Sequence, residues 1–188
     1  MSGSRMNEGK VGIVTGGGGA IGRAIALGLA ESGARVVVVD IGASVEGAGV
    51  DDGPAYQVAN EIKAKGGEAI VSTLSITEPG NADAIVAQAI EAFGRVDILV
   101  NNAGIIRDTM FHKMSWVDWH DVLNVHLNGS FAMSKAVAPH FREQGSGSFI
   151  HMTSTSALIG QLGQANYMAA KMGIVGMSRA IAIDMQRF

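Results

Sequence analysis

The chain has 188 residues, of which 47% are hydrophobic and 16% charged, with a formal net charge of −3 and no cysteine. This length suits one domain with a sizeable core. The lack of cysteine excludes disulfides, thiolate metal sites and cysteine nucleophiles, and scattered Lys and Arg residues without a basic face argue against a nucleic-acid partner.

No apolar run approaches the roughly 20 residues that a membrane-spanning helix needs. Residues 1–9 also lack the apolar segment of a signal peptide. We therefore expect no membrane partner, a cytoplasmic location, an N-terminal tail over residues 1–9 and a single domain over residues 10–188.

The first predicted element is an apolar strand over residues 11–14, which leads through a glycine-rich turn into a helix over residues 21–30. Strand, glycine turn and helix in succession begin a βαβ unit. Glycines let the backbone come close to a ligand and direct the helix N-terminus at its phosphates. The turn over residues 15–22 therefore predicts a dinucleotide site. A P-loop kinase is disfavoured because no Gly-Lys-Ser/Thr follows.

A β-branched strand over residues 35–39 is typical of a parallel sheet that is buried on both faces. It ends in Asp40, which could accept hydrogen bonds from the adenosine ribose and repel a 2′-phosphate, so NAD is favoured over NADP. Alternatively, Asp40 only caps the following turn. The glycine-rich stretch over residues 41–53 is either a solvated loop or a segment that folds over the adenine end of the cofactor.

Helices and strands continue to alternate along the chain. We predict a helix that begins at Pro54 and stops at residues 65–67, a strand over residues 68–72, a helix over residues 81–93 and a strand over residues 97–100. A capping box over residues 115–118 opens a long helix towards Gln144, in which Pro139 predicts a kink. This alternation predicts an α/β fold with a parallel sheet.

Near the end of the chain, an apolar strand over residues 147–154 would place Ser154 at its carboxyl end, where open α/β sheets bind ligands. The helix that opens over residues 164–171 carries Tyr167 and Lys171 one turn apart on one face. A phenol has a reference pKa of about 10, and a nearby ammonium favours the phenolate. The pattern indicates a proton-transfer site. Taken alone, it also fits a packing aromatic beside a solvated lysine.

These motifs together resemble the short-chain dehydrogenases/reductases. Ser154 precedes Tyr-x-x-x-Lys by thirteen positions, residues 15–22 resemble Thr-Gly-x-x-x-Gly-x-Gly with Ala20 for the middle glycine, and residues 101–104 match Asn-Asn-Ala-Gly. Within the family, the chain is closest in motif to the 3-hydroxyacyl-CoA dehydrogenase part of multifunctional enzyme type 2. The resemblance implies a Rossmann-like, doubly wound parallel sheet.

The resemblance also implies roles for particular residues. Cofactor contacts are expected from Thr15, Gly16, Gly18, Gly19, Ile21, Gly22, Asp40, Ser75, Ile76, Asn102, Ala103, Gly104, Tyr167 and Lys171. Ser75 stands where the family commonly has an Asp that holds the adenine amino group. His126 stands where the family usually has an Asn that holds a proton-relay water. It could pass a proton itself, keep that water in place, or be a buried core residue.

Two functions are consistent with these residues. The first is an NAD(H)-dependent oxidoreductase that interconverts a secondary alcohol and a ketone, with 3-hydroxyacyl thioesters as candidate substrates. In this function Tyr167 is the acid/base, and Ser154 and Lys171 assist it. The family resemblance implies a homodimeric or homotetrameric assembly. The second is a non-catalytic dinucleotide-binding or scaffold protein. The chain stops where the family continues into a sixth and a seventh strand. We therefore expect activity from a longer gene product rather than from these 188 residues alone.

Overall fold

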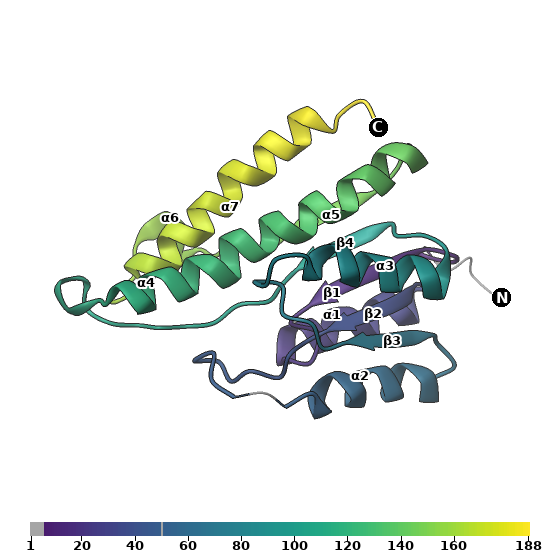
Figure 1. Cartoon of the computed structure of the whole chain (residues 1–188), viewed down its shortest axis with the longest axis horizontal. Helices are drawn as coiled ribbons and strands as arrows, with labels where there is room; N and C mark the ends of the chain where they lie inside the picture. Colours follow the sequence, from purple (N-terminus) through teal and green to yellow (C-terminus); the bar gives the residue numbers. More distant parts are fainter. Residues whose placement is uncertain (1–5, 50) are drawn as a thin grey trace.

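A parallel five-stranded sheet forms the centre of the computed structural model, which describes residues 6–49 and 51–188 (Figure 1). The strands are β1 (Val11–Thr15), β2 (Arg35–Val39), β3 (Ala69–Ser72), β4 (Ile98–Asn101) and β5 (Ser148–His151), in the order β3-β2-β1-β4-β5. The order reverses between β1 and β4. In open α/β sheets, this reversal opens a ligand crevice at the carboxyl ends of the strands. The predicted α/β, Rossmann-like fold is confirmed.

Helices cover both faces of the sheet. They are α1 (Ala20–Glu31), α2 (Gly53–Ala64), α3 (Asn81–Phe93), the 3₁₀ turn η1 (Phe111–Lys113), α4 (Trp116–Leu123), the π-helical turn η2 (Asn124–Asn128), α5 (Gly129–Gln144), α6 (Ser156–Ile159) and α7 (Ala165–Asp184). Figure 1 shows the sheet lying between α2 and α5. None of the helices in the described ranges is both long and apolar enough to cross a membrane.

The valines of β2 explain why the sheet has two cores. Val36 and Val38 pack with α1 and α2 on one face, whereas Val37 and Val39 pack with α3 and α5 on the other. Successive side chains of a strand point to opposite faces, so an unbroken valine run suits a strand buried on both sides. Each fully buried valine contributes about 1.5–3 kcal/mol to folding. The sheet is therefore a rigid support for the turns at its edge.

The long helix predicted from Ser115 to Gln144 is interrupted. Its start is as expected, because Ser115 Oγ accepts a hydrogen bond from Asp118 N at 3.0 Å. However, residues 124–128 form a π-helical turn with His126 buried inside it. Such turns arise where one residue is inserted into an α-helix, often at functional sites. A single extra residue barely disturbs apolar periodicity, so the sequence pattern did not indicate it.

The last strand is shorter than predicted. β5 ends at His151, not at Ser154, because its partner β4 ends at Asn101 and these two residues are paired in register. Ser154 therefore lies three positions beyond the strand, in the connection to α6. It still follows the carboxyl end of β5, which is the side of the sheet where the crevice opens.

Candidate active site

One hydroxyl joins the turns that follow β1 and β4. Thr15 Oγ1 accepts hydrogen bonds from Asn102 N at 3.0 Å and Ala103 N at 3.1 Å, and donates to Val100 O at 3.3 Å. In return, the Asn102 side chain donates to the carbonyl oxygens of Thr15 and Gly16, both at 3.1 Å. The two turns therefore form a single floor at the carboxyl edge of the sheet.

Two glycines allow this close approach. Gly16 has φ +64°, and a Cβ there would lie 2.8 Å from the Cα of Ala103. A Cβ on Gly22, in the first turn of α1, would lie 2.0 Å from the carbonyl oxygen of Gly16. Gly19, just before the helix, has no side chain to cap it. The first amide groups of α1 are thus left for a ligand, an arrangement that suits phosphates.

A cavity of about 560 Å³ lies over this floor. This volume is within the usual range for small-molecule and cofactor sites. Ten of the predicted cofactor residues line it: Gly16, Gly19, Ile21, Gly22, Asp40, Ser75, Ile76, Asn102, Ala103 and Gly104. Of the other four, Thr15 is buried beneath the floor, and Gly18, Tyr167 and Lys171 are not among the lining residues. A dinucleotide fits the tight glycine turn, the helix N-terminus and the acidic wall that these residues provide.

Asp40 and Ser75 occupy one wall of the cavity. Asp40 accepts hydrogen bonds from Gly18 N at 2.8 Å and from Gly42 N at 2.7 Å, so it caps its own turn and also holds the glycine turn. Ser75 Oγ lies 2.8 Å from Thr77 Oγ1. Both residues also line the cavity. The capping role of Asp40 is therefore observed, and the residue also borders the cavity.

The glycine-rich loop after Asp40 is more than a solvated connection. Val45 O accepts a hydrogen bond from Ile106 N at 2.8 Å, and residues 43–45 and Gly47 line the cavity. The loop thus reaches across to the segment that follows β4. It forms a wall of the cavity, and its contact with the adenine end of a cofactor stays a prediction.

Tyr167 and Lys171 come together as the spacing predicts. The Lys171 Nζ atom lies 5.5 Å from the centroid of the Tyr167 ring and donates a hydrogen bond to Met152 O at 2.6 Å. Lys171 is only 4% exposed, and this burial lowers its pKa to about 8. At neutral pH, Lys171 is therefore still largely an ammonium group beside a half-buried phenol.

Ser154 lies two residues beyond Met152, the residue that holds Lys171. Its hydroxyl is half-buried and lies 2.8 Å from Ser156 Oγ. The neighbouring Thr153 hydroxyl donates to Lys171 O at 3.1 Å, which ties this connection to α7. The chain after β5 is thus held against the helix that carries Tyr167.

His126 packs against Tyr167 from the π-helical turn. It is 3% exposed, its Nε2 atom lies 2.8 Å from Ile105 O, and its ring meets the Tyr167 ring edge-on with centroids 5.1 Å apart. Burial, with a smaller effect from the Lys171 charge, lowers the His126 pKa to about 4. His126 is therefore neutral at physiological pH. Nε2 also lies 3.2 Å from Ile105 N, but its contact with Ile105 O is the shorter, so we assign the proton to Nε2, which leaves Nδ1 as an acceptor.

Residues 10–188 match the family described as short chain dehydrogenase. The chain belongs to the short-chain dehydrogenases. It is 45% identical over 177 residues to the peroxisomal multifunctional enzyme type 2 of Drosophila melanogaster, covering 94% of this chain and 29% of that protein. It is 39% identical over 176 residues to a 3-oxoacyl-[acyl-carrier-protein] reductase of Synechocystis, covering 94% of this chain and 68% of the reductase.

A crystal structure of a short chain dehydrogenase from Mycobacterium avium gives a TM-score of 0.88 at 42% identity. The match covers 96% of this chain and 64% of that one. The chain thus spans less than two thirds of this dehydrogenase and less than a third of the multifunctional enzyme. The resemblance to the family, and to multifunctional enzyme type 2 within it, is confirmed.

The sequence analysis did not identify two residues of the present chain that belong to the site or lie next to it. Arg107 lines the cavity, and Asn166, next to Tyr167, is fully buried. For Asn166, the only signal in the sequence was an asparagine in the first turn of an apolar helix, because a buried amide needs hydrogen-bond partners.

In the described ranges, no group of three or more His, Asp or Glu side chains is placed to hold a metal ion.

The buried His126 of this dehydrogenase should make stability depend on pH. The unfolded chain takes up a proton at this residue below about pH 6.5, whereas the folded chain does so only near pH 4. The free energy of unfolding should therefore fall as the pH drops through this window, by about 3 kcal/mol at 1.36 kcal/mol per pKa unit. Chemical denaturation of wild type and His126→Asn at several pH values measures the difference.

Other groups titrate in the same window, so only the difference between the two proteins is informative. His112→Asn, at an exposed position in η1, is the matched control and should keep the wild-type slope. If His126→Asn showed the same slope as wild type, His126 would not be held neutral in the folded protein.

Proposed function

We propose that the protein is an NAD(H)-dependent oxidoreductase that interconverts a secondary alcohol and a ketone. The observation that carries this proposal is the buried Lys171 ammonium 5.5 Å from the Tyr167 ring, on the same side of the sheet as the glycine-floored cavity. The alternative, a non-catalytic dinucleotide-binding protein, would not require a lysine to be buried beside a phenol.

In the oxidation direction, the alcohol O–H bond breaks and its proton passes to the Tyr167 phenolate oxygen. The Lys171 ammonium stabilises that phenolate and is also expected to bind the nicotinamide ribose. The Ser154 hydroxyl positions the substrate oxygen, and its contact with Ser156 orients it. NAD, when bound, supplies the acceptor for the two electrons and the hydrogen that leave the carbon. Reduction of a ketone reverses these steps.

His126 is expected to assist without changing charge, because its pKa of about 4 keeps it neutral during turnover. Its Nδ1 atom is buried and has no hydrogen-bond partner within the described residues. This atom can accept a hydrogen bond from a water that relays protons towards Lys171. The proposed role of His126 is therefore to hold that water, as the family's Asn does at the equivalent position.

Asp40 is expected to select NAD over NADP. Its carboxylate can accept hydrogen bonds from the adenosine ribose and repel a 2′-phosphate. Because hydrogen bonds to charged groups contribute about 1.5–3 kcal/mol each, we expect Asp40→Ala to weaken NAD binding roughly 10- to 100-fold. NADP binding should weaken less, and titration of NADH and NADPH fluorescence measures both.

Asp40→Asn is the control for the capping role, since its Oδ1 atom can still accept one backbone hydrogen bond. It should retain more stability than Asp40→Ala while losing the discrimination against NADP. If both variants bound NADP as poorly as wild type, Asp40 would not determine the cofactor.

A 3-hydroxyacyl thioester is the proposed substrate class. It is supported by the similarity to a protein named as a 3-oxoacyl-[acyl-carrier-protein] reductase. The decisive experiment pairs the intact mass of the natural protein with an NAD-reduction assay on 3-hydroxyacyl-CoAs, steroids and small cyclic alcohols. NAD-linked turnover would support the catalytic assignment, whereas NAD binding without turnover of any substrate would favour the binding protein.

Two further proposals concern the assembly, which the family suggests, and the location, which the sequence suggests. We propose a homodimer or homotetramer, which light scattering of the purified protein can measure. We also propose a cytoplasmic location, which a tagged protein expressed in its own cells can test.

A further inference from the structure

Asn166 is a fully buried amide immediately before Tyr167 on α7. It is 0% exposed, and its side chain makes three hydrogen bonds. Nδ2 donates to Arg107 O at 3.1 Å and to Asp118 O at 3.0 Å, while Oδ1 accepts from Tyr167 N at 2.7 Å. Both donors of the amide group are therefore used, and its oxygen is satisfied.

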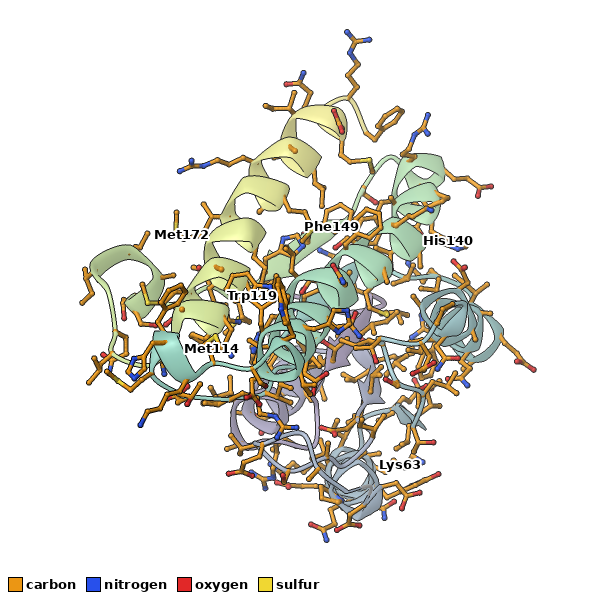
Figure 2. The ribbon with its side chains drawn as sticks, turned by 60° about the vertical axis from the view of Figure 1, so that its left-hand side comes forward. Lys63, Met114, Trp119, His140, Phe149 and Met172 are labelled. Atoms are coloured by element: carbon orange, nitrogen blue, oxygen red, sulfur yellow. The ribbon has the colours of Figure 1, made fainter. Side chains whose placement is uncertain are left out.

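These hydrogen bonds join three separate parts of the fold at the start of α7. Arg107 belongs to the segment after β4, Asp118 belongs to α4, and the Tyr167 amide lies in the first turn of α7. The first amide groups of a helix lack partners within that helix, so Asn166 supplies one of them. Trp119 lies where α4 meets α7, next to this junction (Figure 2).

The segment held by Asn166 is also a wall of the cofactor cavity. Ile105 and Arg107 line that cavity. On its other sides, the segment is fixed by His126 Nε2, 2.8 Å from Ile105 O, and by the hydrogen bond from Ile106 N to Val45 O at 2.8 Å. The side chain of Asn166 is therefore a direct link between the cavity wall and the backbone of Tyr167.

We propose that Asn166 is a positioning residue that fixes the Tyr167 phenol relative to the bound cofactor. This inference rests on the proposed function for its effect on turnover. Asn166 does not touch the reacting atoms, and it acts through the backbone of Tyr167. A displacement of a reacting group by about 1 Å can cost about 100-fold in rate, so the link matters even where binding is unaffected.

Asn166→Asp is the most informative substitution because it nearly conserves volume. The aspartate can still accept from Tyr167 N, but its second oxygen would face the carbonyl oxygens of Arg107 and Asp118 and could not donate to them. Asn166→Ser keeps one hydroxyl donor and should be milder. We expect kcat to fall about 100-fold in Asn166→Asp, with little change in the dissociation constant for NAD.

A buried polar group also contributes to stability, so a matched control is needed. Asp97 is buried at the amino end of β4, away from the cavity, and accepts hydrogen bonds from Val11 N at 2.9 Å and Arg95 Nε at 2.8 Å. Asp97→Asn should lower the melting temperature while kcat stays near the wild-type value. If both Asn166 variants reduced kcat no more than this control does, the positioning role would be wrong.

A second measurement on the full natural polypeptide is independent of turnover. With 3-fluorotyrosine incorporated, Tyr56 and Tyr167 each give a fluorine resonance, which Tyr→Phe variants assign. In Asn166→Ser, and in Asn166→Asp where it folds, the Tyr167 resonance should move or split while that of Tyr56 on α2 stays. An unchanged Tyr167 resonance would overturn the inference. A wild type that binds NAD without turnover would refute the proposed function, yet the fluorine spectra would still test the positioning.

Discussion

Tyr167→Phe is expected to lower turnover by about 10²–10⁴-fold, the usual contribution of general acid–base catalysis, and to leave NAD affinity almost unchanged. The substitution removes only the phenol oxygen. The ring keeps its edge-on contact with His126 and its place beside Lys171, so the cavity and the fold should be preserved. Steady-state kinetics, together with NADH fluorescence titration, separates the two effects.

Tyr56→Phe is the matched control. Tyr56 lies on α2 and is 49% exposed, so its replacement should alter neither turnover nor affinity. If Tyr167→Phe kept more than about a tenth of the wild-type rate, the loss of transition-state stabilisation would be too small for an acid/base, and Tyr167 would have to be withdrawn from that role.

Gly22→Ala is the second substitution with a large expected effect. The added Cβ would lie 2.0 Å from Gly16 O and 2.8 Å from Asn102 Nδ2. The first neighbour is backbone and cannot rotate away, so the glycine turn itself must shift. Overpacking of this kind costs about 1–3 kcal/mol and sometimes more, a large part of a typical stability of about 5–15 kcal/mol. We expect a marked drop in melting temperature and loss of measurable NAD binding.

Gly28→Ala on the same helix isolates the cause. A Cβ on Gly28 has no neighbour within 4 Å, and replacing a helical glycine by alanine usually stabilises a protein by about 0.5–1 kcal/mol. Gly28→Ala should therefore bind NAD like wild type, with an equal or higher melting temperature. Normal NAD binding by Gly22→Ala would show that the turn has more room than the structure indicates.

The regular parts of the fold could be predicted because their signals are local. The valine run of β2 indicated a strand buried on both faces, and Ser115 followed by Asp118 indicated a helix start. The glycine turn was predictable for a similar reason, since residues 15–22 lie between a strand and a helix. In each case, neighbouring residues determine the conformation, and packing in the sheet does not change it.

Two of the features that were wrong or missed depend on distant partners, and a third depends on a small local change in a helix. β5 ends at His151 because β4 ends at Asn101, which no pattern within residues 147–154 reveals. Asn166 finds its partners 48 and 59 positions away. The π-helical turn around His126 depends on one inserted residue, which periodicity does not resolve. Such features require the fold to be known first.

The hydrogen bonds of Thr15 have a consequence for the order of folding. Thr15 and Asn102 are 87 positions apart, whereas β1, β2 and β3 are consecutive in the chain and pair as neighbours. Contacts between distant positions form late because the entropy of closing a long loop must be overcome first. The floor of the cavity should thus appear after the first three strands have assembled. Dinucleotide is therefore expected to slow the unfolding of the folded protein. Dinucleotide that is present from the start of refolding should not accelerate the first folding step.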